Sequence, residues 1–515
     1  MLTPDYLDSV ADEIIDLYAD LEDGIIRDIA RSIVKAGEVT SSAGWQAVRL
    51  QHMGLLYDDI IRLVSEITDA SSAQIRGIFE DAGVTSVDAD NAIYRSAGLD
   101  VIPIKLMPDA MQALEAGLRK TSGHLANLTM TTAAQGQQTF IRAITLAEMQ
   151  IESGAYGYSA AIRNAVKKAS ADGAWVQFPS GHRDRVDVAA RRAILTGVNQ
   201  TVATISLSHA LMMGSDLVET TAHAGARPSH VTWQGRVFSL SGRSAKYPEF
   251  TSGTGYGTGE GLCGYNCRHS FYPYFDGLSA PAYSAAKLDE YSQKSVSYNG
   301  DILTYYDATQ VQRGMERKIR ETKRELVGLD AAIEAADDDS LRGDLKGDYN
   351  KTASDLKTLE RRLKDFLRQA GLQKDSSRTQ VAGFGHSQAQ KAVWAARRVQ
   401  TDRENAIIIS KIKKEAGIRG TVELNPTIPD VKALSFDDEH ITARGHSVTL
   451  DQALEYIASA KIKITRWNGK YENYYSDSGA AFVDAAESKI RTAFSALEYD
   501  EKTRKMMEVL RRYAK

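Results

Sequence analysis

Residues 4–35 read PDYLDSVADEIIDLYADLEDGIIRDIARSIVK, and their apolar side chains recur at steps of three and four residues. This spacing predicts an amphipathic α-helix that buries one face against neighbouring elements. The apolar positions are Leu7, Val10, Ile14, Ile15, Leu17, Tyr18, Leu21, Ile25, Ile26, Ile29 and Ile33. The pattern continues to about residue 78 after an interruption at residues 36–44. Core packing accounts for such a stripe without a ligand, so the segment indicates fold and not function.

The composition is that of a folded, helix-rich protein. Hydrophobic residues make up 43% and charged residues 25% of the 515 residues, as in ordinary globular proteins. Only 10 residues are Pro, which favours long uninterrupted helices. The formal net charge of -4 argues against a protein that coats DNA through a global positive field.

Cysteine content and hydropathy indicate which kinds of protein the chain does not resemble. The two cysteines, Cys263 and Cys267, are too few for a disulfide-rich secreted scaffold, so we expect folding in a reducing cytoplasm. The first residues contain no basic segment followed by an apolar core, so no signal peptide is expected. An apolar run of about 18 residues is also missing, so we expect no membrane-spanning segment.

Changes in composition along the chain predict five parts. They are a helical N-terminal region at residues 1–210, a loop-rich Gly/Cys/His module at 211–300, an antiparallel helical hairpin at 301–372, a helix and linker at 373–430, and a small α+β domain at 431–515. Within the fourth part, residues 417–429 have the composition of a linker. The expected fold class is therefore mainly α with α+β regions.

The hairpin is predicted from two runs of heptad-like spacing, which is typical of a coiled coil. The positions are Met315, Ile319, Thr322, Leu326, Leu329 and Ile333 in the first run, and Leu345, Tyr349, Thr352, Leu356, Leu359, Leu363 and Phe366 in the second. Residues 337–340 separate the runs and predict the turn between two antiparallel helices.

Three short motifs follow the helical region in a fixed order. They read ARPSH at residues 226–230, WQGR at 233–236 and NCRHSFYP at 266–273. In this order they resemble the minor capsid proteins of tailed bacteriophages, the phage minor capsid protein 2 group related to the Mu F-like head morphogenesis proteins. The resemblance covers residues 1 to about 400.

The resemblance implies a structural minor capsid protein, assembled in the host bacterial cytoplasm and incorporated into the phage head near the portal. There it would aid head assembly or DNA packaging and ejection. The implied partners are portal and capsid proteins, with packaged DNA as a further partner. Long helices suit this role because they offer extended surfaces to partner proteins.

Five side chains of the loop-rich module form a candidate metal-binding set: His223, His230, Cys263, Cys267 and His269. Cys and His can complete tetrahedral zinc coordination, but the four-residue step between the cysteines is not diagnostic. The alternative is a polar network in which Arg227, Arg236 and Arg268 bind carbonyls and carboxylates while the histidines act as buried donors. The sequence favours the network, so the expected cofactor is none, with zinc as the alternative.

The C-terminal segment contains SFDDEH at residues 435–440, RGH at 444–446, ITRWNGKYENYYSDSGAAFVD at 464–484 and IRTAF at 490–494. It resembles the small domains of the barnase, EndoU, colicin and RelE-like nuclease class that are fused to phage head proteins. The resemblance implies an alternative function, a virion-carried RNase that cleaves RNA without a metal.

That chemistry needs a base, an acid and a cation at the phosphate. The candidate catalytic residues are His440 and His446 as acid and base, Arg466 and Arg491 for the phosphate, Thr492 for a non-bridging oxygen, and Tyr471, with Tyr474 and Tyr475, for base stacking. Asp437, Asp438 and Glu439 argue against phosphate binding, and Trp467 with the tyrosines is equally consistent with the core of a small sheet. Enzymatic activity therefore stays an alternative at this point.

Overall fold

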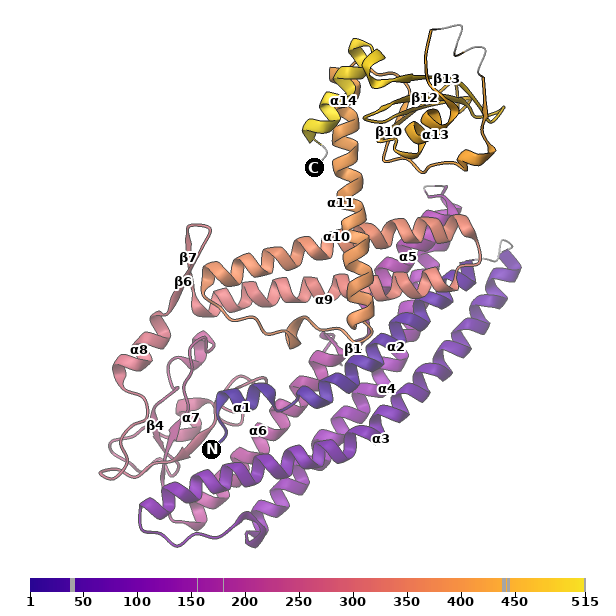
Figure 1. The fold of residues 1–515 in the computed structure, drawn as a ribbon. Helices are drawn as coiled ribbons and strands as arrows, with labels where there is room; N and C mark the ends of the chain where they lie inside the picture. The colour runs from indigo at the N-terminus through magenta and orange to yellow at the C-terminus, as the bar shows by residue number, and fades with distance from the viewer. Residues whose placement is uncertain (38–41, 155, 179, 438–440, 442–444, 514–515) are drawn as a thin grey trace. The chain divides into compact units, whose positions relative to one another are not determined.

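The computed structural model describes residues 1–37, 42–154, 156–178, 180–437, 441 and 445–513 (Figure 1). Helices dominate and the sheets are small, which confirms the predicted fold class, mainly α with α+β regions. The chain forms two compact units, Met1–Ala396 and Arg397–Lys515. Among the described residues, no helix combines the length and apolar character needed to cross a membrane.

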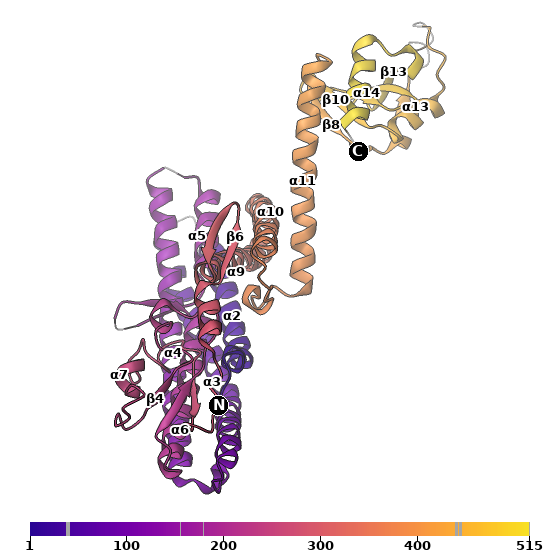
Figure 2. The same ribbon diagram turned by 90° about the vertical axis from the view of Figure 1, so that its left-hand side faces the viewer.

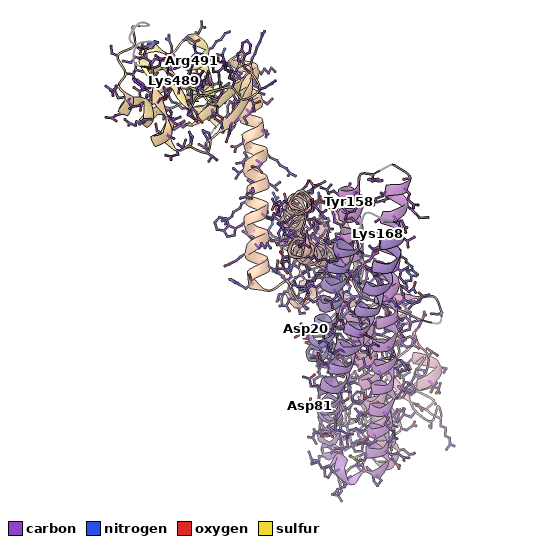
Figure 3. The ribbon with its side chains drawn as sticks, turned by 90° about the vertical axis from the view of Figure 1, so that its right-hand side faces the viewer. Asp20, Asp81, Tyr158, Lys168, Lys489 and Arg491 are labelled. Carbon is purple, nitrogen blue, oxygen red and sulfur yellow. The ribbon has the colours of Figure 1, made fainter. Side chains whose placement is uncertain are left out.

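The first unit is built from long helices that lie side by side (Figures 1 and 2). Its first six helices are α1 (Pro4–Ser9), α2 (Asp12–Gly37), α3 (Ser42–Ser96), α4 (Pro108–Glu152), α5 (Tyr158–Asp172) and α6 (Val186–Met212), with the short η1 (Ile104–Leu106), β1 (Trp175–Gln177) and β2 (Arg183–Arg185) between them. Thr3 caps α1, since its Oγ1 accepts from Tyr6 N at 3.1 Å. The Tyr6 hydroxyl donates to Asp81 Oδ2 at 2.7 Å, which fastens α1 to α3 (Figure 3 labels Asp81).

Helix α2 lies at the centre of the first unit. It contacts α3, α4, α5, α6 and α9 (Tyr305–Ala335). Ile14, Leu21 and Ile25 on α2 are fully buried, as the apolar stripe of this segment predicts. Because neighbours surround it, the stripe is covered by helices from distant parts of the chain.

Helices α4 and α6 approach closely through paired small residues. A Cβ at Gly117 of α4 would overlap the side chain of Thr201 on α6, and a Cβ at Gly197 of α6 would overlap Thr121 on α4. Glycine at these two positions therefore sets the distance between the helix axes.

Helices α9 and α10 (Asp339–Ala370) form the predicted helical hairpin, joined by residues 336–338. Leu326, Leu329, Leu345 and Leu356 are buried, as their heptad positions predict. The hairpin belongs to the same apolar core as α2, and this core runs from Leu2 to Ala396. A cut at residue 210 would thus divide one core.

The loop-rich module follows α6. It contains β3 (Leu217–Thr220), η2 (Pro228–His230), β4 (Val237–Ser239), α7 (Phe250–Thr254) and β5 (Phe271–Pro273). The strands form an antiparallel sheet in the order β4-β3-β5. The last part of the module contains α8 (Ala285–Gln293) and β6 (Ser295–Tyr298), and β6 forms a hairpin with β7 (Asp301–Thr304) just before α9.

The second unit is a six-stranded sheet with helices on both faces. The turn η3 (Ser377–Thr379) belongs to the first unit, and α11 (His386–Glu415) begins in the first unit and ends in the second. The other elements of the second unit are β8 (Thr421–Leu424), η4 (Val431–Ala433), β9 (Ser435–Phe436), α13 (Leu450–Ala458), β10 (Ile462–Arg466), β11 (Tyr471–Tyr475), β12 (Gly479–Asp484), β13 (Lys489–Ser495), η5 (Ala496–Glu498) and α14 (Glu501–Tyr513). The strand order is β8-β10-β11-β12-β13-β9. All pairs are antiparallel except β13 with β9.

The segment 417–429 is not the linker that its composition suggested. It contains β8, which pairs with β10 and forms an edge of the sheet. Ile408 and Ile412 of α11 join the apolar cluster on one face of this sheet together with Met506 of α14. Helix α13 packs on the other face. The sequence-based boundary at residue 431 therefore leaves out part of the core of the second unit.

A buried carboxylate lies inside the core of the first unit. Glu22 of α2 is 4% exposed, and it pairs with Arg324 of α9, 3% exposed, at 3.3 Å. Its other oxygen lies 3.5 Å from Arg185 Nη1 and accepts a hydrogen bond from Ala174 N at 3.3 Å. One side chain thus connects three segments that are far apart in sequence.

We predict that Glu22→Gln lowers the free energy of unfolding by about 3–5 kcal/mol, because it leaves the buried Arg324 charge uncompensated. Urea unfolding followed by far-UV circular dichroism measures this. Glu66→Gln is the matched control: Glu66 pairs with Arg62 at 3.4 Å with both side chains 61% exposed, so its effect should stay below about 1 kcal/mol. Equal effects of the two substitutions would contradict the assignment.

We predict that residues 397–515 fold alone, whereas residues 434–515 do not. The shorter fragment keeps α14 but lacks β8 and the α11 side chains of the apolar cluster, so part of one face of its sheet would be exposed to water. Amide dispersion in NMR spectra and the cooperativity of thermal unfolding compare the fragments. A native-like spectrum from residues 434–515 would show that β8 and α11 are dispensable.

Candidate functional site

The loop that carries both cysteines is packed against α6. Asn199 of α6 is buried, and its Nδ2 donates to the carbonyl oxygens of Cys267 and His269 at 3.0 Å each. Cys263 and Cys267 share an apolar cluster with Trp233 and with Ala203 of α6. The position of the loop therefore depends on the helical core.

The backbone of this loop turns sharply. Cys263 and Asn266 have φ values of 58° and 54°, in the left-handed region. A Cβ at Gly261 or Gly264 would overlap the backbone of residues 255–259. The glycine-rich sequence before Cys263 thus permits two chain segments to touch.

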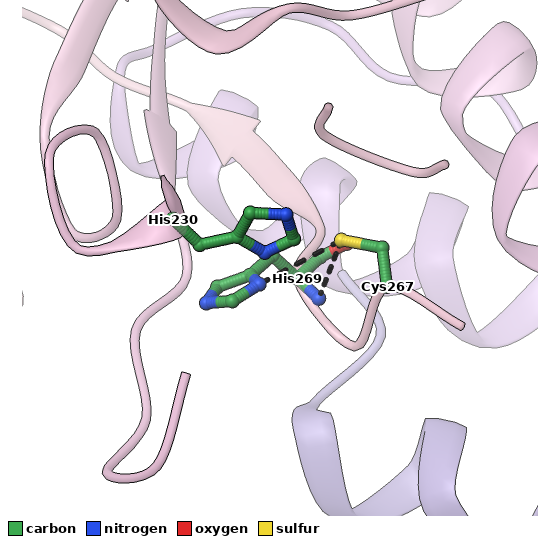
Figure 4. A group of neighbouring side chains, drawn as sticks. All are labelled: His230, Cys267 and His269. Carbon is green, nitrogen blue, oxygen red and sulfur yellow. Dashed lines mark hydrogen bonds between the residues drawn. The ribbon is translucent and has the colours of Figure 1, made fainter. Parts of the chain in front are cut away.

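His230, Cys267 and His269 lie together where this loop meets the turn η2 (Figure 4). One ligand atom of each lies within 4.8 Å of the others, and the side chains are 1–2% exposed. Cys267 Sγ is 3.6 Å from His269 Nδ1. Three of the five sequence-predicted metal ligands therefore converge, from the turn η2 and from the loop before β5.

Hydrogen bonds set the tautomers of both histidines. His269 Nε2 lies 3.1 Å from Gln234 Oε1, and the same oxygen accepts from His223 N at 3.2 Å, which fixes the amide orientation. His230 Nε2 lies 2.8 Å from the carbonyl oxygen of Glu260. Because these oxygens can only accept, Nε2 carries the proton in each neutral ring, and Nδ1 carries the lone pair.

Burial keeps both imidazoles neutral. It lowers the pKa of His269 well below its usual value and also lowers the pKa of His230. Burial likewise raises the pKa of the Cys267 thiol. At neutral pH the group therefore consists of neutral rings and a protonated thiol, the state from which a metal would displace the thiol proton.

The other two predicted ligands have different surroundings. The His223 ring stacks on His269 with centroids 4.5 Å apart, and its Nδ1 lies 3.0 Å from the carbonyl oxygen of Ala224. Cys263 Sγ lies 3.7 Å from the carbonyl oxygen of His269 within the apolar cluster. The structure therefore does not place these two side chains among the converging ligand atoms.

Two of the three arginines of the predicted polar network, Arg227 and Arg268, make such contacts, whereas Arg236 is exposed. Arg227 Nη2 donates to the carbonyl oxygen of Tyr265 at 2.7 Å, and Arg268 pairs with Asp8 at 2.7 Å. Asp8 also pairs with Arg191 at 3.2 Å and with Arg378 at 3.1 Å. These contacts tie α1, α6 and η3 to the module.

A cavity of about 770 Å³ lies between these elements. Its walls include Asp8, Arg191, Arg313, His230, Cys267 and His269. The Cys and His group thus borders a space large enough for water molecules.

Sequence reasoning missed the residues that hold this group in place. Gln234 belongs to the WQGR motif, but nothing in the motif indicates that its amide joins two histidines. The sequence could have indicated a role for Asn199, since it is a polar side chain on the buried face of an apolar helix and must find a hydrogen-bond partner there. Asp8 had none, because its partners are distant in sequence.

The candidate catalytic residues of the second unit have different surroundings in the structure. His440 lies outside the described residues. His446 Nδ1 lies 2.8 Å from Glu498 Oε1, and its ring is 5.4 Å from that of Phe494. Tyr474 and Tyr475 are 1% and 4% exposed, so the prediction that they stack on an RNA base is wrong.

Arg466, Tyr471 and Arg491 come together at one end of the sheet. Arg466 and Tyr471 are cross-strand partners, and the Arg491 guanidinium lies 5.5 Å from the centre of the Tyr471 ring. Arg491 is the extra residue of a β-bulge, because the register of β12 with β13 shifts beside it (Figure 3 labels it). Thr492 is 7% exposed, too buried to contact a large ligand freely. Trp467 is 80% exposed, so the alternative that it forms the sheet core is also wrong.

The match to a protein family lies within the first unit. Residues 2–368 match the family model described as phage minor capsid protein 2. A segment of 149 residues is 28% identical to a protein described as a structural protein of Lactococcus phage LL-H. This similarity covers 28% of the chain and 37% of that relative, so the match spans little more than a third of the relative's length. No solved structure matches the chain.

We predict that Asn199→Ala lowers the free energy of unfolding by about 1–3 kcal/mol, since two buried carbonyl oxygens lose their donor. Denaturant unfolding measures the change. The neighbouring Gln200→Ala, on a half-buried position of the same helix, serves as the control and should have a smaller effect. If Asn199→Ala were as mild as its control, α6 would not hold the loop through this amide.

Proposed function

This chain belongs to the phage minor capsid protein 2 family, and from that premise we propose that it acts in the phage head near the portal, where it aids assembly or DNA packaging and ejection. A structural role in the virion follows from the family. The position near the portal is our proposal, and host cytoplasmic assembly belongs to it.

The observation that carries the proposal is the extent of the family match. Residues 2–368 comprise nearly all of the helical core, and the match ends inside α10. The part of the chain that defines the family is therefore a single packed body, which suits a component that must hold its shape in a particle. The second unit lies beyond the match.

One end of the helical bundle offers a surface for a partner. Here α3 ends, α4 begins and α6 ends, and Ile104 packs with Ile205 and Leu114 in a small apolar cluster. Beside this cluster, Leu106 is 65% exposed, Leu211 84% and Met212 49%. We propose that this apolar bundle end, defined by these last three residues, contacts the portal or capsid.

No enzymatic function is proposed for the second unit. Of the imidazole pair in the RNase alternative, His440 lies outside the described residues, and His446 has its Nδ1 2.8 Å from Glu498 Oε1. The family match gives no support to that alternative, since it stops at residue 368.

We predict that residues 1–396 co-purify with the portal protein of the same phage and that residues 397–515 do not. This division respects the observed core, unlike a cut at residue 210. A pull-down after co-expression measures the binding. Equal retention of portal by residues 397–515 would contradict an interaction through the helical unit.

We further predict that Leu211→Ser with Met212→Ser reduces portal binding by at least about tenfold, because burial of a Leu or Met side chain contributes about 1.5–3 kcal/mol. Both side chains are exposed, so the fold should persist, as circular dichroism can verify. Leu497→Ser, at a residue of the second unit that is 95% exposed, is the control. Unchanged binding by the double variant would exclude the apolar bundle end as the contact with the portal.

A further inference from the structure

The three converging side chains of Figure 4 have the composition of a transition-metal site. One thiolate and two imidazoles suit Zn²⁺, which accepts both sulfur and nitrogen ligands. We propose that His230, Cys267 and His269 bind one Zn²⁺ ion per chain. This inference is independent of the role in the phage head.

The separation between Cys267 Sγ and His269 Nδ1 fits zinc coordination. With Zn–S near 2.3 Å, Zn–N near 2.05 Å and a tetrahedral angle, the sulfur and nitrogen ligands of one ion lie about 3.6 Å apart. The separation of Cys267 Sγ from His269 Nδ1 is 3.6 Å. A ring nitrogen of His230 lies within 4.8 Å of both atoms, so binding of one ion requires this ligand to move closer to the other two.

The hydrogen bonds around the histidines match those of metal ligands. A metal-bound imidazole usually donates its other N–H to a carbonyl or carboxylate oxygen, which fixes the ring. Gln234 Oε1 and the carbonyl oxygen of Glu260 have these positions for His269 and His230. Both rings thus keep Nδ1 for the ion, although the sequence alone favoured a network without metal.

The fourth coordination position has an available source. All three residues line the 770 Å³ cavity, so a water molecule from it can complete a tetrahedron. On binding, the Cys267 S–H bond breaks, the electron pair stays on sulfur to form the Zn–S bond, and the proton leaves to solvent. The ion would then tie the η2 turn to the loop before β5.

Metal emission spectroscopy on the full-length protein, purified without metal-affinity resin, tests the proposal. We expect close to one zinc per chain, and less than a tenth of that in Cys267→Ser. Cys263→Ser is the matched control because it makes the same chemical change four residues away, in the same apolar cluster, and it should keep the zinc. Loss of zinc from both variants alike would overturn the assigned ligand set.

A second measurement uses wild-type protein, so that it does not depend on whether the variants fold. Wild-type protein, stripped with a chelator and refilled with Co²⁺, should show thiolate-to-cobalt charge-transfer absorption, and restored Zn²⁺ should raise its thermal midpoint. Folded wild-type protein that contains no zinc and yields no cobalt absorption would overturn the proposal. The group would then be the polar network alone.

Discussion

The burial of α2 within a single apolar core is the interaction on which the rest of the first unit depends. Helices from two of the sequence-predicted parts, residues 1–210 and 301–372, cover it, so neither part buries its apolar face alone. Burial of apolar area drives this assembly, and close contacts such as that of Gly117 with Thr201 fix how the helices meet. Inside the core, Glu22 adds a geometric restraint, because its carboxylate contacts two guanidinium groups and a backbone N–H from three distant segments at once.

The geometry of the group formed by His230, Cys267 and His269 depends on this core. The loop before β5 has little regular structure of its own, and two carbonyl oxygens on it are held by Asn199 of α6. Asp8 supplements this by pairing with arginines from α6, the loop and η3. Ligand atoms a few ångströms apart are thereby positioned by helices and not by the loop that carries them. A rigid scaffold that presents functional groups on loops is a common division of labour in proteins.

The second unit follows a different physical plan. Its sheet alternates side chains between two apolar clusters, so that Tyr475 faces α11 and α14 while Tyr474 faces α13. The sequence predicted that these two tyrosines stack on an RNA base, but in the structure they are buried on opposite faces of the sheet. The β-bulge at Arg491 instead leaves a cationic side chain beside Tyr471 at the rim.

The sequence by itself determined the helices and their faces, because a 3.6-residue period is local and survives any change of neighbour. It therefore predicted the stripe of α2 and the hairpin of α9 and α10. The tertiary structure decided what depends on distant residues. The four residues of β8 carry too short a pattern to distinguish an edge strand from a linker, and only pairing with β10 makes them a strand. Likewise, the sequence assembled five candidate ligands by residue type, whereas folding selected His230, Cys267 and His269, because convergence of side chains is set by how α6 and the module pack and not by their spacing along the chain.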